Sequence, residues 1–442
     1  GLFGSPGVLL TSLRLMDALG EAEFDRLETT FLRDFPEHRT TLAMGDSLTA
    51  GGTFARSVRF GGIQYGTNFA TDPDFVTFPL PSIGGLAAQP STIEVIVDNV
   101  RQLTREVPPG PFTIGHLPVL TGAGEVQLTV TDLLGRQRLI TQSFYVSPRL
   151  LRQGLHEFSY EVGFLRRRFG ERSFDYGAPF VSTTHRYGFD DARTGELHGE
   201  AAPDRLAAIV GGSMRLGNLG VVTAGVGGSL SDRGSGLFFQ GGYEYVSRQF
   251  DFGIRSRYRS DGLELAGETQ RIARSDAVNF GIRLRDGARL GLLLAHEVRR
   301  HERDLLSLSA SLSQRLGSGS LIASAVGLLE PKRDFALTLA YALPLSNFRS
   351  ATSQLDLRDG RPRAQIQFRQ GRGATDLGFD YRIEATAQEG DSRLDGRLSW
   401  QGQQGALEFE AEASFDGVDA RLGASGTAAF VGGRAFLTRR IG

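Results

Sequence analysis

Cysteine is absent from this chain of 442 residues. The chain therefore has no disulfide framework, no thiolate metal site and no cysteine nucleophile. Lysine is almost absent too, because Lys332 is the single one and every other basic residue is an arginine. The formal net charge of -1 gives no sign of the basic surface on which nucleic-acid binding depends. These absences exclude thiol chemistry and give no indication of a nucleic-acid partner.

Long hydrophobic runs are missing as well. The longest apolar stretch, Leu321 to Leu329, is far shorter than the ~18 consecutive apolar residues of a membrane-spanning helix. This excludes a helical membrane protein but not a membrane-spanning β-barrel, whose strands need only alternation. The chain starts at Gly1 without a charged and apolar leader. We expect that a signal peptide has been removed or lies outside this sequence.

Apolar and polar residues alternate with a period of two from about Arg248 onward. Stretches of this kind cover 250–258, 278–284, 306–313, 335–343 and 377–383. Successive side chains of a strand point to opposite faces, so each stretch has one apolar and one polar face. Turn signals such as Asp286-Gly287 separate the stretches, and 58 glycines suit many tight turns. The pattern predicts an antiparallel, all-β, up-and-down meander.

Two kinds of fold can accommodate this meander, a soluble β-sandwich and a transmembrane β-barrel. The polar face carries arginine and serine in strand after strand, and few strands are apolar on both faces. A water-filled interior and a lipid-facing exterior explain both features. The pattern therefore favours a large barrel whose lumen is faced by polar residues, among them Arg255, Arg257, Arg283 and Arg285.

The segment from Gln89 to Ser147 departs from the meander. Its short strands are expected at 92–97, 125–130 and 139–144. Prolines, which are unsuited to central strands, flank it at Pro79, Pro81, Pro90 and Pro148. We expect barrel strands over 1–88 and 148–442 and a small β-domain over 89–147. The rest of the chain then has room for roughly 24 strands of ~10 residues.

Several groups of residues between Gly45 and Gly170 occur in a recognisable order. They are Gly45-Asp46-Ser47 with Phe54 and Phe60 to Gln64; Pro79 to Gly85; Val95 to Asn99 with the run Pro108-Pro109-Gly110-Pro111-Phe112; and Leu150 to Gly154 with Tyr160 and Gly163. Together they resemble the fimbrial outer-membrane usher family of the chaperone–usher pathway, and the proline run matches its plug motif. Departures at Gly61-Gly62, 72–76 and 131–135 bear on the subfamily, with a spore-coat-like pilus branch as the candidate.

This resemblance implies a barrel of about two dozen strands in the outer membrane of a Gram-negative bacterium. A β-sandwich plug domain, inserted in one connection and occluding the lumen, is implied with it. The implied function is translocation and assembly of pilus subunits, and the implied partners are periplasmic chaperone–subunit complexes, pilus subunits and outer-membrane lipid. The resemblance also implies that the chain is the pore alone, without the chaperone-binding and C-terminal domains. The alternative is a plugged outer-membrane porin or transporter for small solutes, whose plug would lie at the N-terminus.

Gly45-Asp46-Ser47-Leu48 spells the signature of an esterase family in which the serine is the nucleophile. Such an enzyme needs a histidine preceded three residues earlier by aspartate, and none of the seven histidines has one. His296 and His301 are five residues apart, which places them on opposite faces of a strand and disfavours a metal site. We therefore expect no catalytic residue, no metal and no cofactor, and interpret Ser47 as part of a turn at a strand end.

Overall fold

The structure, a computed structural model, describes residues 7–18, 21–81, 83–87, 91–97, 100–108, 110–114, 117, 121–132, 137–267, 271–284, 287–346, 348–358, 360–372, 377–415, 417–431 and 434–438. Strands dominate these residues, and a 3-10 helix, η1 (Phe69–Thr71), accompanies them. None of the described residues belongs to a helix long and apolar enough to span a membrane.

In the described part of the chain, 24 strands form one antiparallel sheet. Four of them precede the insert: β1 (Val8–Ala18), β2 (Glu21–Phe35), β3 (Thr40–Leu48) and β4 (Arg59–Thr67). The others follow it: β11 (His156–Arg166), β12 (Tyr176–Asp190), β13 (Arg193–Ala202), β14 (Arg205–Arg215), β15 (Val221–Ser231), β16 (Gly234–Val246), β17 (Phe250–Arg259), β18 (Ile272–Arg283), β19 (Arg289–Arg299), β20 (Leu305–Leu316), β21 (Gly319–Glu330), β22 (Asp334–Ser346), β23 (Arg349–Arg358), β24 (Arg361–Gln370), β25 (Gly378–Gln388), β26 (Asp391–Gln401), β27 (Ala406–Ser414), β28 (Gly417–Ser425), β29 (Thr427–Val431) and β30 (Arg434–Thr438).

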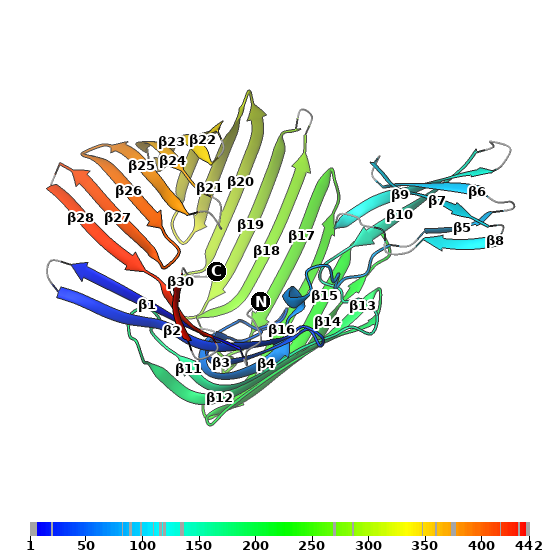
Figure 1. Ribbon diagram of the computed structural model, residues 1–442, viewed down its shortest axis with the longest axis horizontal. Helices are drawn as coiled ribbons and strands as arrows, with labels where there is room; N and C mark the ends of the chain where they lie inside the picture. The colour runs from blue at the N-terminus through cyan, green and yellow to red at the C-terminus, as the bar shows by residue number, and fades with distance from the viewer. Residues whose placement is uncertain are drawn as a thin grey trace.

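The sheet curls into a barrel whose two ends meet over part of their length (Figure 1). From β1 to β4 and from β11 to β28 each strand pairs with its sequence neighbour, and β4 pairs with β11, so the wall continues across the insert. Closure comes from β1, which pairs with β2 on one edge and with β28 and β29 on the other. Closing a sheet removes the exposed edges that would otherwise pair with other chains. The strand number and the up-and-down order confirm the predicted barrel of about 24 strands.

The two faces of the wall differ as the alternation predicts. On β22, Phe335, Leu337 and Leu339 point outward with 56%, 50% and 47% of their surface exposed. On β13, Glu196 and His198 point inward and are buried. An outer surface of large apolar side chains is what lipid contact requires, while the polar groups are kept inside.

The insert between β4 and β11 forms a separate small β-domain. It contains β5 (Ile83–Ala87), β6 (Ser91–Val97), β7 (Val100–Val107), β8 (Gly110–Ile114), β9 (Gly122–Asp132) and β10 (Gln137–Val146). A four-stranded sheet, β10-β9-β6-β7, packs with the pair β5-β8 around buried residues that include Ile93, Val95 and Leu128. The three strands expected from the sequence correspond to β6, β9 and β10. Because β5 pairs with β8, the unit begins before Gln89 in this structure.

The small domain lies beyond one end of the barrel, outside the ring (Figure 1). This position differs from the lumen-filling one that the resemblance implies. Its physical basis is the tether. Both ends of the insert join the wall at the same end of the barrel, where β4 stops and β11 starts, so the domain can rest on the rim without disturbing any strand pair. We call the insert-bearing end of the barrel the tether end.

Candidate functional site

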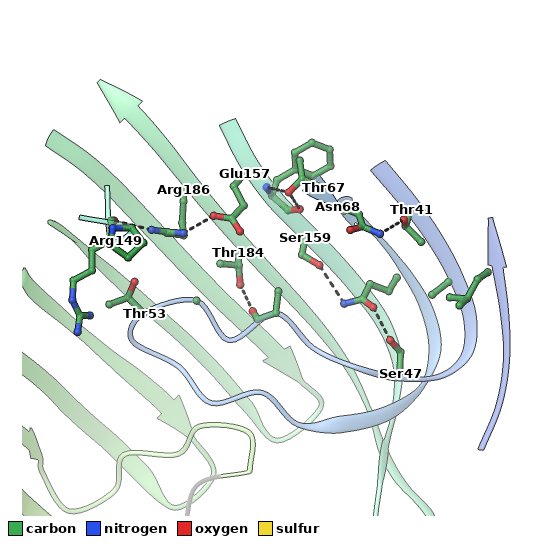
Figure 2. A pocket seen from close by; sticks show the side chains of 18 of the residues that line it. Thr41, Ser47, Thr53, Thr67, Asn68, Arg149, Glu157, Ser159, Thr184 and Arg186 are labelled. Atoms are coloured by element: carbon green, nitrogen blue, oxygen red, sulfur yellow. Dashed lines mark hydrogen bonds and ion pairs between the residues drawn. The ribbon is translucent and has the colours of Figure 1, made fainter. Parts of the chain in front are cut away.

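The inner wall near the tether carries a recess of about 710 Å³. Side chains from several strands and from the tether itself point into it (Figure 2): Thr41, Ser47, Thr53, Asn68, Arg149, Glu157, Ser159, Thr184 and Arg186. Asn68 donates to the Thr41 hydroxyl over 2.9 Å, and Arg186 forms ion pairs with Glu157 and Glu196. The recess is therefore a polar, charged surface on the lumen side, next to the point where the insert is attached.

Ser47 contributes a hydroxyl to this recess but has no general base. It donates to Oε1 of Gln64 over 2.6 Å, and Nε2 of Gln64 donates in turn to Glu161 over 3.1 Å. An amide oxygen cannot take up the proton of a serine nucleophile. The arrangement is a structural hydrogen-bond chain along the inner wall.

Asp46, the neighbour of Ser47, points to the opposite face. Its carboxylate is buried between the guanidinium groups of Arg26 and Arg166 and accepts a hydrogen bond of 2.7 Å from Tyr176. The backbone N–H of Thr29 donates to it as well, over 2.9 Å. The Gly-Asp-Ser motif thus places one residue in a charge cluster of the wall and the next in the lumen.

The connection between β3 and β4, residues 49–58, folds into the lumen. Two wall carboxylates accept its backbone N–H groups: Glu161 from Ala50 over 3.0 Å and Glu196 from Thr53 over 2.6 Å. Phe54, at its tip, is fully buried. Backbone groups turned away from water need such partners, so the carboxylates are what lets this segment lie against the wall.

Two paired glycines of the inner wall make the space for Phe54. A Cβ atom at Gly211 or at Gly225 would lie 2.6 Å from its ring. Any larger residue at either position would therefore drive the ring away from the wall.

A second connection, between β17 and β18, also folds inward. Its Ala266 N–H donates to Glu200 over 2.7 Å. Leu263 and Leu265 pack with Phe54 and Phe238 in one buried apolar cluster. The two inward segments therefore support each other on one side of the lumen, at the end of the barrel opposite the tether.

Of the arginines predicted to face the lumen, Arg255 lines the recess. Arg257 donates from Nε to Gln240, another recess residue, over 2.7 Å. Arg283 is exposed at the tether end of β18. Arg285 lies outside the described residues. In the described part of the chain, the contacts of the insert with the barrel are at the rim and do not involve Arg255 or Arg283.

The prolines of the sequence motifs lie in the small domain and on the two tethers that join it to the barrel. Pro108 is exposed after β7, and the backbones of Gly110 and Pro111 lie in β8. Phe112 packs against the core of the small domain. Pro79 and Pro81 lie on the incoming tether, where Pro81 accepts from the N–H of Leu117, and Pro148 on the outgoing tether lines the recess. Pro90 and Pro109 lie outside the described residues.

The base of the β9–β10 hairpin contacts the rim at β14–β16. Tyr145, Leu150 and Val221 form a buried cluster there, and the Tyr145 ring stacks on Tyr245 with centroids 5.9 Å apart. The Tyr145 hydroxyl accepts from the N–H of Val246 over 3.2 Å. Burial raises the pKa of Tyr145 to about 12, so its phenol stays neutral and keeps its proton at ordinary pH.

Among the described residues, no group of three or more His, Cys, Asp or Glu side chains is arranged to hold a metal ion. His296 lies in β19, 3.7 Å from Asp276, and His301 lies in the turn that follows.

A closed antiparallel barrel with an apolar outer surface and a polar lumen defines a large transmembrane β-barrel. The outer membrane usher protein family matches residues 14–245, more than half of the chain. The chain belongs to this family, and its location is the outer membrane.

Individual relatives agree with this assignment. The chain is 23% identical over 313 residues to the outer membrane usher protein FasD of Escherichia coli, covering 69% of this chain and 35% of FasD. It is 28% identical over 176 residues to the usher FimC of Bordetella pertussis, covering 39% of this chain and 20% of FimC. The chain thus spans about a third or less of the length of these curated relatives.

Two solved structures share the fold. One is the translocation pore of the P pilus usher PapC, with a TM-score of 0.54 and 14% identity, covering 96% of this chain and 98% of the pore. The other is the PapC chain of an E. coli P pilus tip assembly intermediate, PapC-PapD-PapK-PapG, with a TM-score of 0.70 and 16% identity. That match covers 99% of this chain and 63% of the other.

Proposed function

We propose that this chain is a pore that translocates and assembles pilus subunits across the outer membrane, with the insert as its gate. The observation that carries the proposal is a closed ring of this strand number with a folded domain tethered at one end. A barrel of 16–18 strands already leaves an aqueous channel, and the diameter grows with strand number. Among the described strands the ring has 22 places, because β28 and β29 share one place beside β1 and β30 pairs only with β29. It is therefore wide enough for a folded subunit and, left open, would leak solutes.

The partners in this proposal are periplasmic chaperone–subunit complexes and the pilus subunits themselves. Two observations support them: the membership of the usher family, and the likeness to a PapC chain solved with PapD, PapK and PapG. The polar inner wall fits passage of a folded, hydrated protein surface, because it offers hydrogen-bonding groups rather than an apolar surface to which a subunit would adhere.

The chain acts, in this proposal, as a passive conduit and not as an enzyme. Ser47, the residue with a nucleophile signature, donates to an amide, and its neighbour Asp46 is held by two arginines on the other face. Neither arrangement supplies a general base.

The insert can be tested as the gate by its removal. Replacing residues 83–147 by a short Gly/Ser linker leaves β4 and β11 paired, so the barrel should still fold and insert. We expect conductance in planar bilayers to rise sharply, and cells to become sensitive to large antibiotics that the outer membrane excludes. Equal amounts of folded variant and parent in the membrane are the control. Unchanged conductance in a correctly inserted variant would falsify the gate.

A further inference from the structure

The insert does not project freely from its tether but is docked on the barrel rim. Its contact surface is the base of the β9–β10 hairpin, and the rim surface is formed by the turn before β15 and the end of β16. We call this contact the rim dock. It consists of Gly122, Ala123, Ser143, Tyr145 and Ser147 on the insert and Arg215, Asn218, Val221, Glu244, Tyr245 and Val246 on the rim.

The residues of the rim dock are closely packed and shielded from solvent. Tyr145 is 3% exposed and Val221 is 0% exposed, although each lies at the end of a strand where solvent would otherwise reach it. Gly122 approaches so closely that a Cβ atom there would lie 2.9 Å from the carbonyl oxygen of Val246. A buried aromatic contact of this kind stabilises beyond the area it covers.

Polar groups fix the orientation of the dock. Glu244 forms an ion pair with Arg149 and accepts a hydrogen bond from Ser147 over 3.3 Å. Rim side chains also reach insert carbonyls: Arg215 donates to Tyr145 and Asn218 to Ser143, both over 3.4 Å. Because the acceptors are backbone carbonyls of β10, these hydrogen bonds fix the position of the strand and not only of its side chains.

The outgoing tether, in contrast, has contacts with the wall that do not involve the insert. Leu151 donates its N–H to Thr194 over 2.8 Å, and the carbonyl of Arg149 accepts from Arg186 over 2.9 Å. The pivot therefore lies at Ser147–Pro148, between an anchored tether and a docked domain. Glu244 contacts residues on both sides of this pivot.

We propose that the rim dock is a parking site that holds the insert out of the lumen and so sets the ratio of open to closed pores. This inference rests on the proposed gating function. To enter the lumen, the hairpin base must leave the rim, because both sheets of the insert extend away from the ring while it is docked (Figure 1). The contacts of the dock exist only in the open state. The free energy of docking therefore shifts the equilibrium between open and closed pores toward the open state.

Two variants weaken the dock without emptying its core. Glu244→Ala removes the carboxylate that accepts from the Ser147 hydroxyl, and Tyr145→Phe removes the hydroxyl that accepts from Val246. In planar bilayers each should lower the ratio of open to closed dwell time about two- to fivefold. The matched control is Asp251→Ala on the neighbouring strand. It removes a rim ion pair, with Arg289, whose carboxylate is 24% exposed against 26% for Glu244, and it does not touch the insert. The control ratio should not change.

A cross-link tests the dock in the other direction. The chain has no cysteine, so Ser143→Cys with Asn218→Cys introduces the single reactive pair, at a contact that joins the two surfaces. Joined by a short bis-maleimide, this pair should abolish long closures, whereas each single variant treated alike should still close. Closures that persist after complete cross-linking, in protein whose folded gel band matches that of the parent, would overturn the parking site.

The deletion of 83–147 separates the two levels of the proposal. If deletion opens the pore while the dock variants and the cross-link leave dwell times unchanged, the parking site is wrong and the gate stands. If deletion leaves conductance unchanged, the gate itself is wrong and the dock has no pore to control.

Discussion

Adjacent residues of one short motif have unrelated tasks in this barrel. Asp46 lies in a buried charge cluster of the wall, while Ser47 points into the lumen. Side chains of Asp46, Arg26 and Arg166 are only 6%, 11% and 1% exposed. The aspartate of the motif is therefore held by two guanidinium groups, a phenol and a backbone N–H, which gives it a structural role in the wall.

Removing the Asp46 carboxylate should destabilise the barrel strongly. Asp46→Ala leaves two buried guanidinium groups without their partner, which costs about 3–5 kcal/mol. The measurement is the urea midpoint of the folded band in unheated gel electrophoresis. Asp190→Ala is the control, because the pair that it breaks with Arg193 is solvent-exposed and screened by water, so the midpoint should hardly move. Equal effects of the two variants would contradict the buried cluster.

Ser47→Ala should change little. It removes one hydrogen bond to Gln64, so the loss of stability should be about 1 kcal/mol. Bilayer conductance should match the parent, and neither protein should hydrolyse a nitrophenyl ester above the buffer rate. Ester hydrolysis that disappears in this variant alone would restore the esterase hypothesis.

Some side-chain positions could be predicted from alternation and others could not. Strand alternation places Arg255 and Arg257 on the polar face, and both line or border the lumen recess. It gives no signal for Glu161, Glu196 and Glu200, because their partners are backbone N–H groups of distant connections. Every residue except proline has a backbone N–H, so the sequence does not indicate which residue will donate to these carboxylates. It shows only that carboxylates lie on an inner face.

At the scale of elements, the strands follow from the sequence and the connections do not. A period of two is enough to predict β17, β18, β20, β22 and β25. Residues 49–58 have no period and include small residues, so the sequence is equally compatible with an external loop. Their inward position depends on Phe54 meeting the two glycines of neighbouring strands.

Filling that space should release the inward connection. In Gly225→Val the new side chain overlaps the Phe54 ring, so the N–H groups of Ala50 and Thr53 lose their carboxylate partners. Hydrogen exchange of peptides covering 49–58 should accelerate at least tenfold, which corresponds to about 1.4 kcal/mol. The matched control is Gly241→Val on the adjacent strand, where a Cβ atom meets open space. Similar acceleration in the control would argue against the Phe54 contact.

At the scale of the whole molecule, the position of the insert is the feature that the sequence leaves open. Prolines and irregular spacing predict a separate domain, but a tethered domain can rest in the lumen or on the rim. The difference lies in contacts such as Tyr145 with Tyr245, which join residues 100 positions apart and have no local signature.

The outer surface predicts how the purified chain behaves. Strand after strand exposes large apolar residues, such as Leu394, Leu398 and Trp400 on β26, so the barrel should stay in solution only with detergent. Because β1 pairs with β28 and β29 and so joins the two ends of the sheet, the ring should resist detergent until heated and then show a shifted gel mobility. A monomer that remains soluble and folded after detergent removal would contradict the transmembrane barrel.

The ring should open first at its closing seam. Neighbouring strands such as β20 and β21 pair through a nearly continuous register from Leu306 to Leu316, whereas β1 meets β29 only over Leu9–Ser12 and β28 only at Leu15 and Met16. The partner strand is interrupted at Gly426, between β28 and β29, so ladder hydrogen bonds are lost where the ring closes. Local opening is easiest where the fewest hydrogen bonds must break together. Under mild heating in detergent, hydrogen exchange should therefore reach Leu9–Ser12 and Thr427–Val431 before β20 and β21. Exchange that begins in β20 and β21, or that is uniform around the ring, would show that closure is no weaker than the rest of the wall.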